Sequence, residues 1–261
     1  MKKILIGLVI LPLFLLSNEI TLGVVPQQSP LKLAKKWLQI TEYLNQKTGL
    51  NIVFKTEKSI PLFEEKLYAG VYDIAYMNPY HFIVANSTQK YSAFIRAKKN
   101  IVGIIVANDK NTFDVNSLKN KTFLFPAPNA FAATLLPKYE LKNKYNFDID
   151  KEAKVLYVNS HDSVYKGVSR QIGDFGGGIM RTYNNFLDKN DKDRINIVYK
   201  TSPYPSHPFA SNPRISQDVI EKLTNAFLTM PSELKELLSI KEFKVTNTEE
   251  FNVIRELEVK K

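Results

Sequence analysis

The stretch FLFPAPNAFAATLLP, residues 123–137, shows the local layout on which the fold of this chain depends. A short apolar strand runs into two prolines, and Asn129 then begins a segment with the pattern of a helix. Backbone N–H groups at a helix start have no acceptor within the helix, so such a turn can hold an anion. The residues that follow are Ala130, Phe131 and Ala132, none of which has a polar side chain. The stretch is therefore either an anion site without hydroxyl groups or an ordinary buried helix start.

Three other segments share this layout of a strand, a turn and a helix start. They are VVPQQSP at residues 24–30, YMNPYHF at 76–82 and NSHDSVY at 159–165. Strand and helix patterns alternate over residues 19–87 and again over residues 117–189. This alternation predicts an α/β protein with two lobes, each a doubly wound, mostly parallel sheet with helices on both faces.

The order of the segments also predicts how the chain is divided between the lobes. We expect residues 19–105 and 204–261 to form lobe 1 and residues 106–203 to form an inserted lobe 2, with a hinge between them. The proline-rich segment 193–213 is interpreted as a connection that leaves lobe 2. Because ligands of such sheets bind at the carboxyl ends of strands, the cleft between the lobes is the expected binding site.

The N-terminus has the pattern of a secretory signal peptide, predicted over residues 1–18. Two lysines precede an uncharged apolar run at residues 4–16, and a small residue, Ser17, follows. The run is short for a membrane-spanning helix and is interrupted by Pro12. We predict export to the periplasm with cleavage near Ser17 and Asn18. An uncleaved anchor and a buried helix are the alternatives.

The composition excludes several classes of site. The 261 residues contain no cysteine, which rules out disulfides, thiolate metal sites and a lipid-modified cysteine. The net charge of +10 comes from dispersed lysines, which indicate a solvated surface rather than a nucleic-acid interface. The three histidines lie in separate turns without metal-ligand spacing, and no G-x-S-x-G, H-E-x-x-H or P-loop motif occurs. We expect a monomeric binding protein that is not an enzyme and needs neither a metal nor a cofactor.

The order of four segments resembles a known family. GVVPQQSPLKLAKKW, FEEKLYAGVYDIAYMNPYHF, FPAPNAFAATLLP and SHDSVYKGV, spread over roughly residues 20–230, are similar to segments of the periplasmic substrate-binding proteins of phosphate, phosphite and phosphonate ABC transporters, the PhnD-like family. The resemblance implies a two-lobed, type II-like periplasmic-binding-protein fold that closes over a small oxyanion. It also implies an ABC permease in the inner membrane as partner. A ligand-sensing receptor that feeds a membrane histidine kinase is the alternative on the same scaffold.

Two positions depart from the pattern of that family. The usual phosphonate loop has a serine, a threonine and a serine before a glycine, where this chain has Ala130, Phe131, Ala132 and Ala133. A hydrogen bond to a charged group contributes roughly 1.5–3 kcal/mol, so the loss of three hydroxyl donors predicts weaker phosphonate binding. A gapless match also places Arg181 where amino-phosphonate binders have an aspartate, and an arginine there favours an anion.

The candidate ligand contacts lie in the four turns, after the glycines at 176–178 and near residue 204. The resemblance gives His161 the role of a donor to an oxyanion, and the alternative is a helix-start histidine bonded to its own backbone. For Ser29 and Asn78 the alternative is a purely structural role in capping or turning the chain. For Arg181 the alternative is an ordinary solvated side chain. The glycines at 176–178 could allow the backbone to approach a ligand closely, and the alternative is tight packing of a helix on the sheet. The candidates are Gln27, Gln28, Ser29, Tyr76, Asn78, Tyr80, His81, Asn129, Ala130, Phe131, Ala132, His161, Arg181 and His207.

Overall fold

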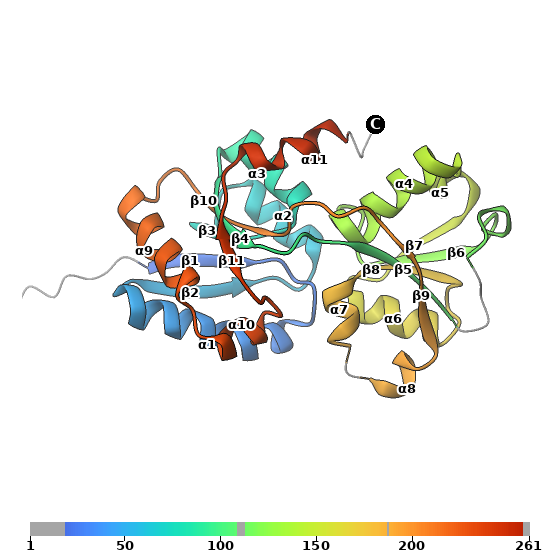
Figure 1. Ribbon diagram of the computed structural model, residues 1–261, viewed down its shortest axis with the longest axis horizontal. Coiled ribbons are helices and arrows are strands. Elements are labelled where there is room, and N and C mark those ends of the chain that lie inside the picture. The colour runs from blue at the N-terminus through green and yellow to red at the C-terminus, as the bar shows by residue number, and fades with distance from the viewer. Residues whose placement is uncertain (1–18, 109–112, 187, 258–261) are drawn as a thin grey trace, which may run out of the picture.

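The computed structural model describes residues 19–108, 113–186 and 188–257, and the predicted signal peptide lies outside these residues. Two α/β lobes lie side by side along the long axis of the molecule (Figure 1). Each lobe has one sheet, and two segments of chain cross between the lobes. Among the described residues no helix is both long enough and apolar enough to cross a membrane.

Lobe 1 is built on a six-stranded sheet with the order β11-β4-β10-β3-β1-β2. Its strands are β1 (Glu19–Val24), β2 (Asn51–Thr56), β3 (Ile74–Tyr76), β4 (Ser92–Ala97), β10 (Pro208–Ser211) and β11 (Phe243–Val245). Its helical segments are α1 (Pro30–Thr48), α2 (Ile60–Tyr68), α3 (Pro79–Gln89), α9 (Gln217–Leu228), α10 (Ser232–Leu237), η3 (Glu249–Phe251) and α11 (Asn252–Glu256).

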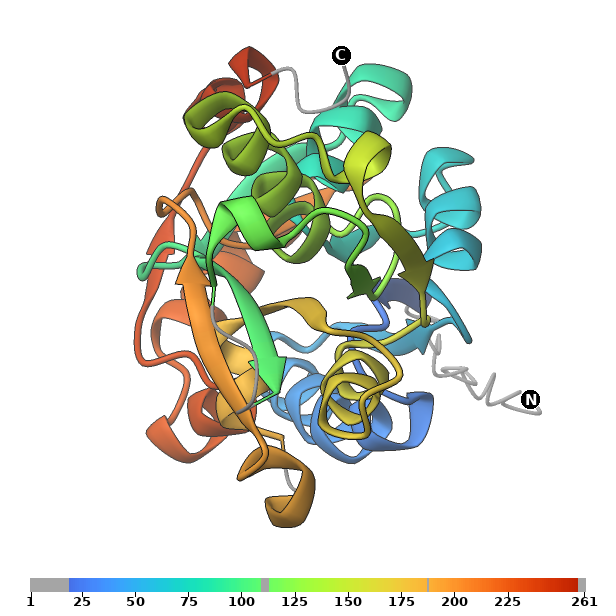
Figure 2. The ribbon, with the colours of Figure 1, turned by 90° about the vertical axis from the view of Figure 1, so that its right-hand side faces the viewer.

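Lobe 2 is built on a five-stranded sheet with the order β7-β6-β8-β5-β9. Helices α4 and α5 lie on one face of this sheet and α6 on the other (Figures 1 and 2). The strands are β5 (Gly103–Asn108), β6 (Thr122–Phe125), β7 (Lys154–Tyr157), β8 (Phe175–Ile179) and β9 (Ile195–Lys200). The helical segments are η1 (Val115–Ser117), η2 (Phe131–Leu135), α4 (Leu136–Tyr145), α5 (Ile149–Glu152), α6 (His161–Ser169), α7 (Met180–Asn184) and α8 (Lys189–Lys192).

Both sheets are mixed, so the expectation of mostly parallel sheets is wrong in this respect. Strand β1 is parallel to β2 and β3, and β6 is parallel to β7 and β8. Strand β10 is antiparallel to β3 and β4, and β5 is antiparallel to β8 and β9. The reason is that the chain crosses between the lobes twice. A strand that enters a sheet from the cleft must lie antiparallel to the strands that lead toward the cleft.

The segment 193–213, predicted as a connection, contributes a strand to each lobe. Strand β9 pairs with β5 in lobe 2, and β10 is inserted between β3 and β4 in lobe 1. Only the part between them crosses, and it runs beside the crossing that links β4 to β5. The two crossings are joined at Ile101 and Tyr204, whose backbone N–H groups donate to each other's carbonyl oxygens at 2.8 and 3.0 Å. Residues 103–105, expected in lobe 1, belong to β5 of the second sheet.

The helices begin and end at the capping residues, prolines and glycines of the sequence. Helix α1 begins with Pro30 directly after Ser29, and it ends at Gly49, whose φ of 70° favours glycine. Asn78 caps α3, because its side-chain oxygen accepts from the N–H of His81 at 2.8 Å. These turns fix where the loops after β1 and β3 point.

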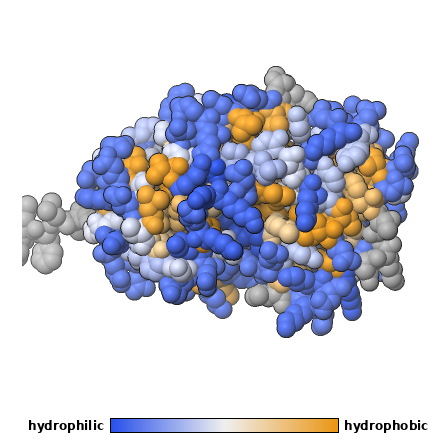
Figure 3. All heavy atoms as spheres, in the orientation of Figure 1, coloured by the Kyte–Doolittle hydropathy of each residue, from blue (hydrophilic) through white to orange (hydrophobic). Residues whose placement is uncertain are grey.

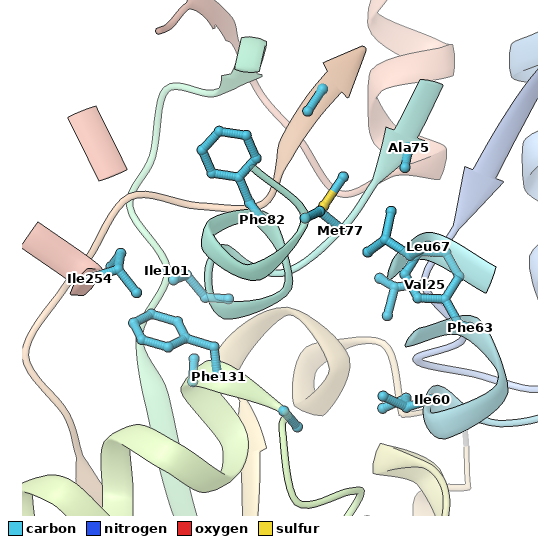
Figure 4. Close-up of a cluster of buried hydrophobic side chains, with 14 of the residues drawn as sticks. Val25, Ile60, Phe63, Leu67, Ala75, Met77, Phe82, Ile101, Phe131 and Ile254 are labelled. Atoms are coloured by element: carbon cyan, nitrogen blue, oxygen red, sulfur yellow. The ribbon is translucent and has the colours of Figure 1, made fainter. Parts of the chain in front are cut away.

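One apolar cluster spans both lobes. Val25 and Ile60 from lobe 1 pack in the same cluster as Phe131 and Leu136 from lobe 2. Figure 4 shows the ring of Phe131 beside Ile101 of the first crossing segment. All of these side chains are buried or nearly so. The lobes are therefore in direct contact, and the structure is the closed arrangement of the two lobes.

Candidate functional site

The loops that follow the parallel strands of both sheets meet between the lobes and enclose a small cavity. Its volume is about 10 Å³, which is about the room that one water molecule needs. Lobe 1 and the two crossings contribute Val25, Gln27, Ile60, Asn78, Ile101 and His207, and lobe 2 contributes Ala130, Phe131, Ala132, Ala133, His161 and Ile179.

One wall of the cavity is a helix start that follows β6. The π-helical turn η2 leads into α4, and its first residues are Phe131, Ala132 and Ala133. The N–H groups of Thr134 and Leu135 both donate to the carbonyl oxygen of Ala130, at 2.7 and 3.2 Å. The three preceding N–H groups have no acceptor within the helix, as at any helix start. They give the cavity wall a positive partial charge that does not depend on side chains.

Two glycines bring this helix start close to the sheet beneath it. A Cβ atom on Gly103 of β5 would collide with the carbonyl oxygen of Ala132, and one on Gly177 of β8 would collide with that of Ala133. A Cβ on Gly178 would collide with the hydroxyl of Tyr165. The glycine run therefore permits tight packing of helix on sheet, which was one of the two alternatives left open by the sequence.

His161 lies at the start of α6 and is almost fully buried at the cavity wall. Its Nδ1 lies 3.2 Å from the hydroxyl oxygen of Thr182, which also lies 2.8 Å from the hydroxyl of Tyr165 and 3.1 Å from the carbonyl oxygen of Ile179. Among the described residues no protein group bonds to Nε2 of this ring. Burial, and next the charge of Arg181, lower the pKa of His161 to about 3. The ring is therefore neutral at pH 7.

His207 is the second buried histidine of the cavity. Its Nε2 lies 3.0 Å from Nε2 of Gln27, an amide nitrogen that can only donate. His207 Nε2 therefore accepts this bond, and the ring proton is on Nδ1. Burial is the main cause that lowers the pKa of His207 well below its ordinary value, and the charge of Arg181 adds to it. Both geometry and burial thus give a neutral imidazole.

Arg181 crosses from lobe 2 to lobe 1 beside the cavity rather than pointing into it. Its Nη1 donates to the hydroxyl of Tyr76 and its Nη2 donates to Oε1 of Gln27, each at 2.6 Å. The guanidinium carbon also lies 5.8 Å from the centre of the Tyr76 ring. Together with Gln28 and Lys36 these side chains line a neighbouring hollow. The role of Arg181 in this closed form is to hold the lobes together at the cavity edge.

Two further groups of polar contacts join the lobes. Asn78 donates to the carbonyl oxygen of Asn129 at 3.0 Å, and the side chain of Asn129 donates to Glu64 at 3.0 Å. On the other side, Lys32 of α1 and Asp162 of α6 form an ion pair at 2.5 Å. Each side of the cleft is thereby closed by at least one bonded pair.

His81 lies away from the cavity, inside lobe 1. Its side chain is fully buried, and Nε2 lies 2.8 Å from Glu64 Oε1 and 3.0 Å from Asn78 Nδ2. The rings of Phe63 and Tyr68 pack around it. His81 is therefore a core residue behind the loop that carries Asn78.

The predicted contacts fall into three groups. Seven candidates line the cavity: Gln27, Asn78, Ala130, Phe131, Ala132, His161 and His207. Gln28, Tyr76 and Arg181 line the neighbouring hollow. Four line neither space: Ser29 is exposed without a side-chain cap bond, Tyr80 and His81 pack in lobe 1, and Asn129 bonds across the cleft.

Sequence reasoning missed two kinds of residue. Ile60, Ile101 and Ile179 line the cavity, but an apolar residue in a strand or helix gives no signal that separates a cavity wall from a core. Thr182 orients His161 from an adjacent helix, which no local pattern indicates. Among the described residues no cluster of three or more histidine and carboxylate side chains could hold a metal ion.

The charges around the cleft favour an anion. The guanidinium of Arg181 and the amine of Lys36 lie at its edge, and burial, followed by the nearby charge of Arg181, lowers the pKa of Lys36. Among the described residues, no carboxylate lines the cavity itself. An anion there would meet backbone dipoles, two neutral imidazoles and two amides, with positive charge close by.

Comparisons with known proteins agree with this geometry. Residues 22–252 match the family model described as "ABC transporter, phosphonate, periplasmic substrate-binding protein". The chain is 22% identical to the phosphate-import protein PhnD of Mycolicibacterium smegmatis, over 80% of this chain and 71% of that protein.

Two solved structures share the fold. One is a binding protein component of an ABC phosphonate transporter from Pseudomonas aeruginosa, with a TM-score of 0.84 and 18% identity, covering 93% of this chain and 86% of that one. The other is PhnD1 from Prochlorococcus marinus in complex with methylphosphonate, with a TM-score of 0.83 and 17% identity, covering 92% of this chain and 96% of that one. By the extent of the family match, this chain belongs to the periplasmic substrate-binding proteins of phosphonate ABC transporters.

Proposed function

We propose that this protein captures a small oxyanion of the phosphonate, phosphite or phosphate class between its lobes and delivers it to an ABC permease. The observation that carries the proposal is the helix start at Phe131–Leu135, whose first three residues line a cavity with walls from both lobes. Relatives named for phosphate import and for methylphosphonate binding support this ligand class.

The chemistry of the cavity suits an oxyanion that is held by neutral donors. Three backbone N–H groups can bond to its oxygens without burying a second charge. Each neutral imidazole adds one donor, Nε2–H of His161 when the hydroxyl of Thr182 donates to Nδ1, and Nδ1–H of His207. Because Ala130, Phe131 and Ala132 have no hydroxyl groups, the backbone supplies the bonds that serine and threonine side chains would otherwise add. We therefore expect weaker binding than in a site with all of these hydroxyls.

The size of the cavity constrains both the ligand and the binding event. A volume of about 10 Å³ holds about one water molecule. A phosphorus oxyanion is larger, so the lobes must separate for it to enter and must close around it less far than in this structure. Hinge closure of this kind is common among periplasmic binding proteins. The two crossings paired at Ile101 and Tyr204 provide the axis for this motion.

The remaining expectations are consistent with this role. We infer that the chain is exported, acts in the periplasm as a monomer and catalyses no reaction. The cavity contains no nucleophile poised beside a base, since its polar side chains are amides and imidazoles.

A thermal-shift measurement on the mature protein tests the proposal. Phosphate, phosphite and methylphosphonate are compared with sulfate at increasing concentration. A ligand that binds only the folded state adds roughly 2.7 kcal/mol of stability at a hundred times its dissociation constant. We expect a saturable shift with at least one phosphorus oxyanion.

A matched pair of variants locates the binding. His161→Ala and His81→Ala each remove a buried histidine ring, but only His161 lines the cavity. The shift should disappear in His161→Ala and persist in His81→Ala. Equal loss in both variants, or no shift with any phosphorus compound, would overturn the proposal.

A further inference from the structure

A second hollow, which we call the hinge pocket, lies beside the two crossing segments. Its volume is about 510 Å³, within the range of about 300–1,000 Å³ that small-molecule sites occupy. Four stretches form its walls: residues 97–102 of the first crossing, 179–185 around the start of α7, 206–207 of the second crossing and 239–242 before β11. Both lobes and both crossings thus contribute to one space.

The inner walls of the hinge pocket are apolar. Ile101, Ile179 and Ile240 are buried, and Val102 and Met180 are partly exposed. Figure 3 views the face on which the crossings run, and hydrophobic side chains gather there between the lobes with hydrophilic ones on both sides. A ligand with a hydrocarbon body would remove this surface from water.

The rim of the hinge pocket carries excess positive charge. Lys98, Lys99, Lys241 and Arg181 line it against one acid, Glu242, which leaves four cations to one carboxylate, or three positive charges in excess. Glu242 is already paired with Lys98 at 2.8 Å. In the described part of the chain, Lys99 and Lys241 have no acidic partner.

Among the described residues, no carboxylate forms an ion pair with Arg181 either. Its guanidinium bonds to uncharged groups, the hydroxyl of Tyr76 and the amide oxygen of Gln27. The positive charges therefore surround a concave apolar space rather than a flat solvated surface. This combination selects for a molecule with an anionic head and an apolar body.

We propose that the hinge pocket is a second ligand site, which binds a small organic anion with an apolar body, such as a carboxylate with a short hydrocarbon chain. The hydrocarbon part packs against Ile101, Val102, Met180 and Ile240, and the anionic head lies at the lysines of the rim. The hinge pocket adjoins the interlobe cavity, with which it shares Ile101, Ile179 and His207, but the cavity's volume of about 10 Å³ cannot hold a hydrocarbon chain.

The test is calorimetric titration of the mature protein with octanoate, kept below its micelle concentration. Octan-1-ol and octylammonium are the matched probes, because they share the hydrocarbon chain but carry no charge or the opposite charge. We expect octanoate to bind at one molecule per protein, and the other two to bind much more weakly. Saturation of the protein with methylphosphonate beforehand should leave the stoichiometry for octanoate unchanged.

Two double variants with the same change in net charge complete the test. Lys99→Glu with Lys241→Glu reverses the rim charges, and we expect it to weaken octanoate binding by about tenfold or more. Lys47→Glu with Lys119→Glu changes exposed lysines in the last turn of α1 and before β6, which do not line the hinge pocket, and should leave binding unchanged. No octanoate binding, equal binding of all three probes, or equal effects of the two double variants would overturn the proposal, whatever the phosphorus oxyanions do.

Discussion

Removing the side chain of Arg181 should shift the balance between closed and open forms. Arg181 donates to Tyr76 and to Gln27 across the cleft, each at 2.6 Å. A bond to a charged group is worth roughly 1.5–3 kcal/mol when buried, but this arginine is partly exposed, so we discount the pair to about 2 kcal/mol in total. A change of that size makes the closed form about 30-fold less favourable relative to the open form in Arg181→Ala.

The absence of cysteine makes this shift measurable. Leu31 of α1 and Ile172 after α6 are 70% and 63% exposed, on different lobes. Spin labels on Leu31→Cys and Ile172→Cys report the distance between the lobes by double electron–electron resonance. We expect a longer distance to gain population in Arg181→Ala without ligand, together with weaker ligand binding, because only the closed form completes the site.

Arg194→Ala is the control for this experiment. Arg194 is an exposed arginine of lobe 2 that follows α8, and among the described residues it has no ion pair. The same charge is thus removed without an interlobe bond. If the distance distribution of Arg181→Ala matches those of Arg194→Ala and the unmodified protein, the role assigned to Arg181 is refuted.

Three further predictions concern the cavity and its supports. Ala132→Ser adds a hydroxyl at the cavity wall and should tighten methylphosphonate binding by about 10- to 100-fold in calorimetry; unchanged or weaker binding would count against an anion at this helix start. Gly177→Ala forces a Cβ against the carbonyl oxygen of Ala133, so it should destabilise the protein by about 1–3 kcal/mol in denaturant titrations. Gly49→Ala, where a Cβ meets nothing within 4 Å and only φ is unfavourable, should cost less. The pKa of His161 is lowered from 6.5 to about 3, so the unfolded state binds more protons between these values and stability falls as pH falls through this window. At pH 5 the loss from this ring is about 2 kcal/mol, so His161→Gln should flatten the dependence of unfolding free energy on pH from 7 to 5, and an unchanged slope would contradict the neutral buried ring.

Much of the fold could be predicted from the sequence because capping residues, prolines and glycines mark the ends of its helices. Ser29, Pro30 and Gly49 mark the ends of α1, which the structure places at Pro30–Thr48. Asn78 before a proline predicted the turn that it caps. Proline and glycine act through backbone dihedrals, which depend little on the rest of the protein.

The strands β9 and β10 show what local patterns cannot predict. Their direction depends on which lobe the chain enters and from which side, which is a property of the whole topology. The prolines around Tyr204 correctly indicated a crossing, but they concealed a strand on each side of it.

The candidate site, too, could be predicted from local patterns only in part. The four turns predicted that Gln27, Asn78 and His161 would meet between the lobes, because carboxyl ends of parallel strands gather at one edge. The sequence could not show that His81 points into lobe 1 while His207 points into the cavity. That difference is set by packing of each ring against residues distant in the chain.

Amide proton chemical shifts show whether an oxyanion binds at the N–H groups of Phe131, Ala132 and Ala133. Titration of ¹⁵N-labelled mature protein with methylphosphonate should move these three amide protons downfield in a saturable manner, because each would form a bond to a charged oxygen. Saturable binding that moves other amides but leaves these three unchanged would place the ligand elsewhere and contradict an anion site at this helix start.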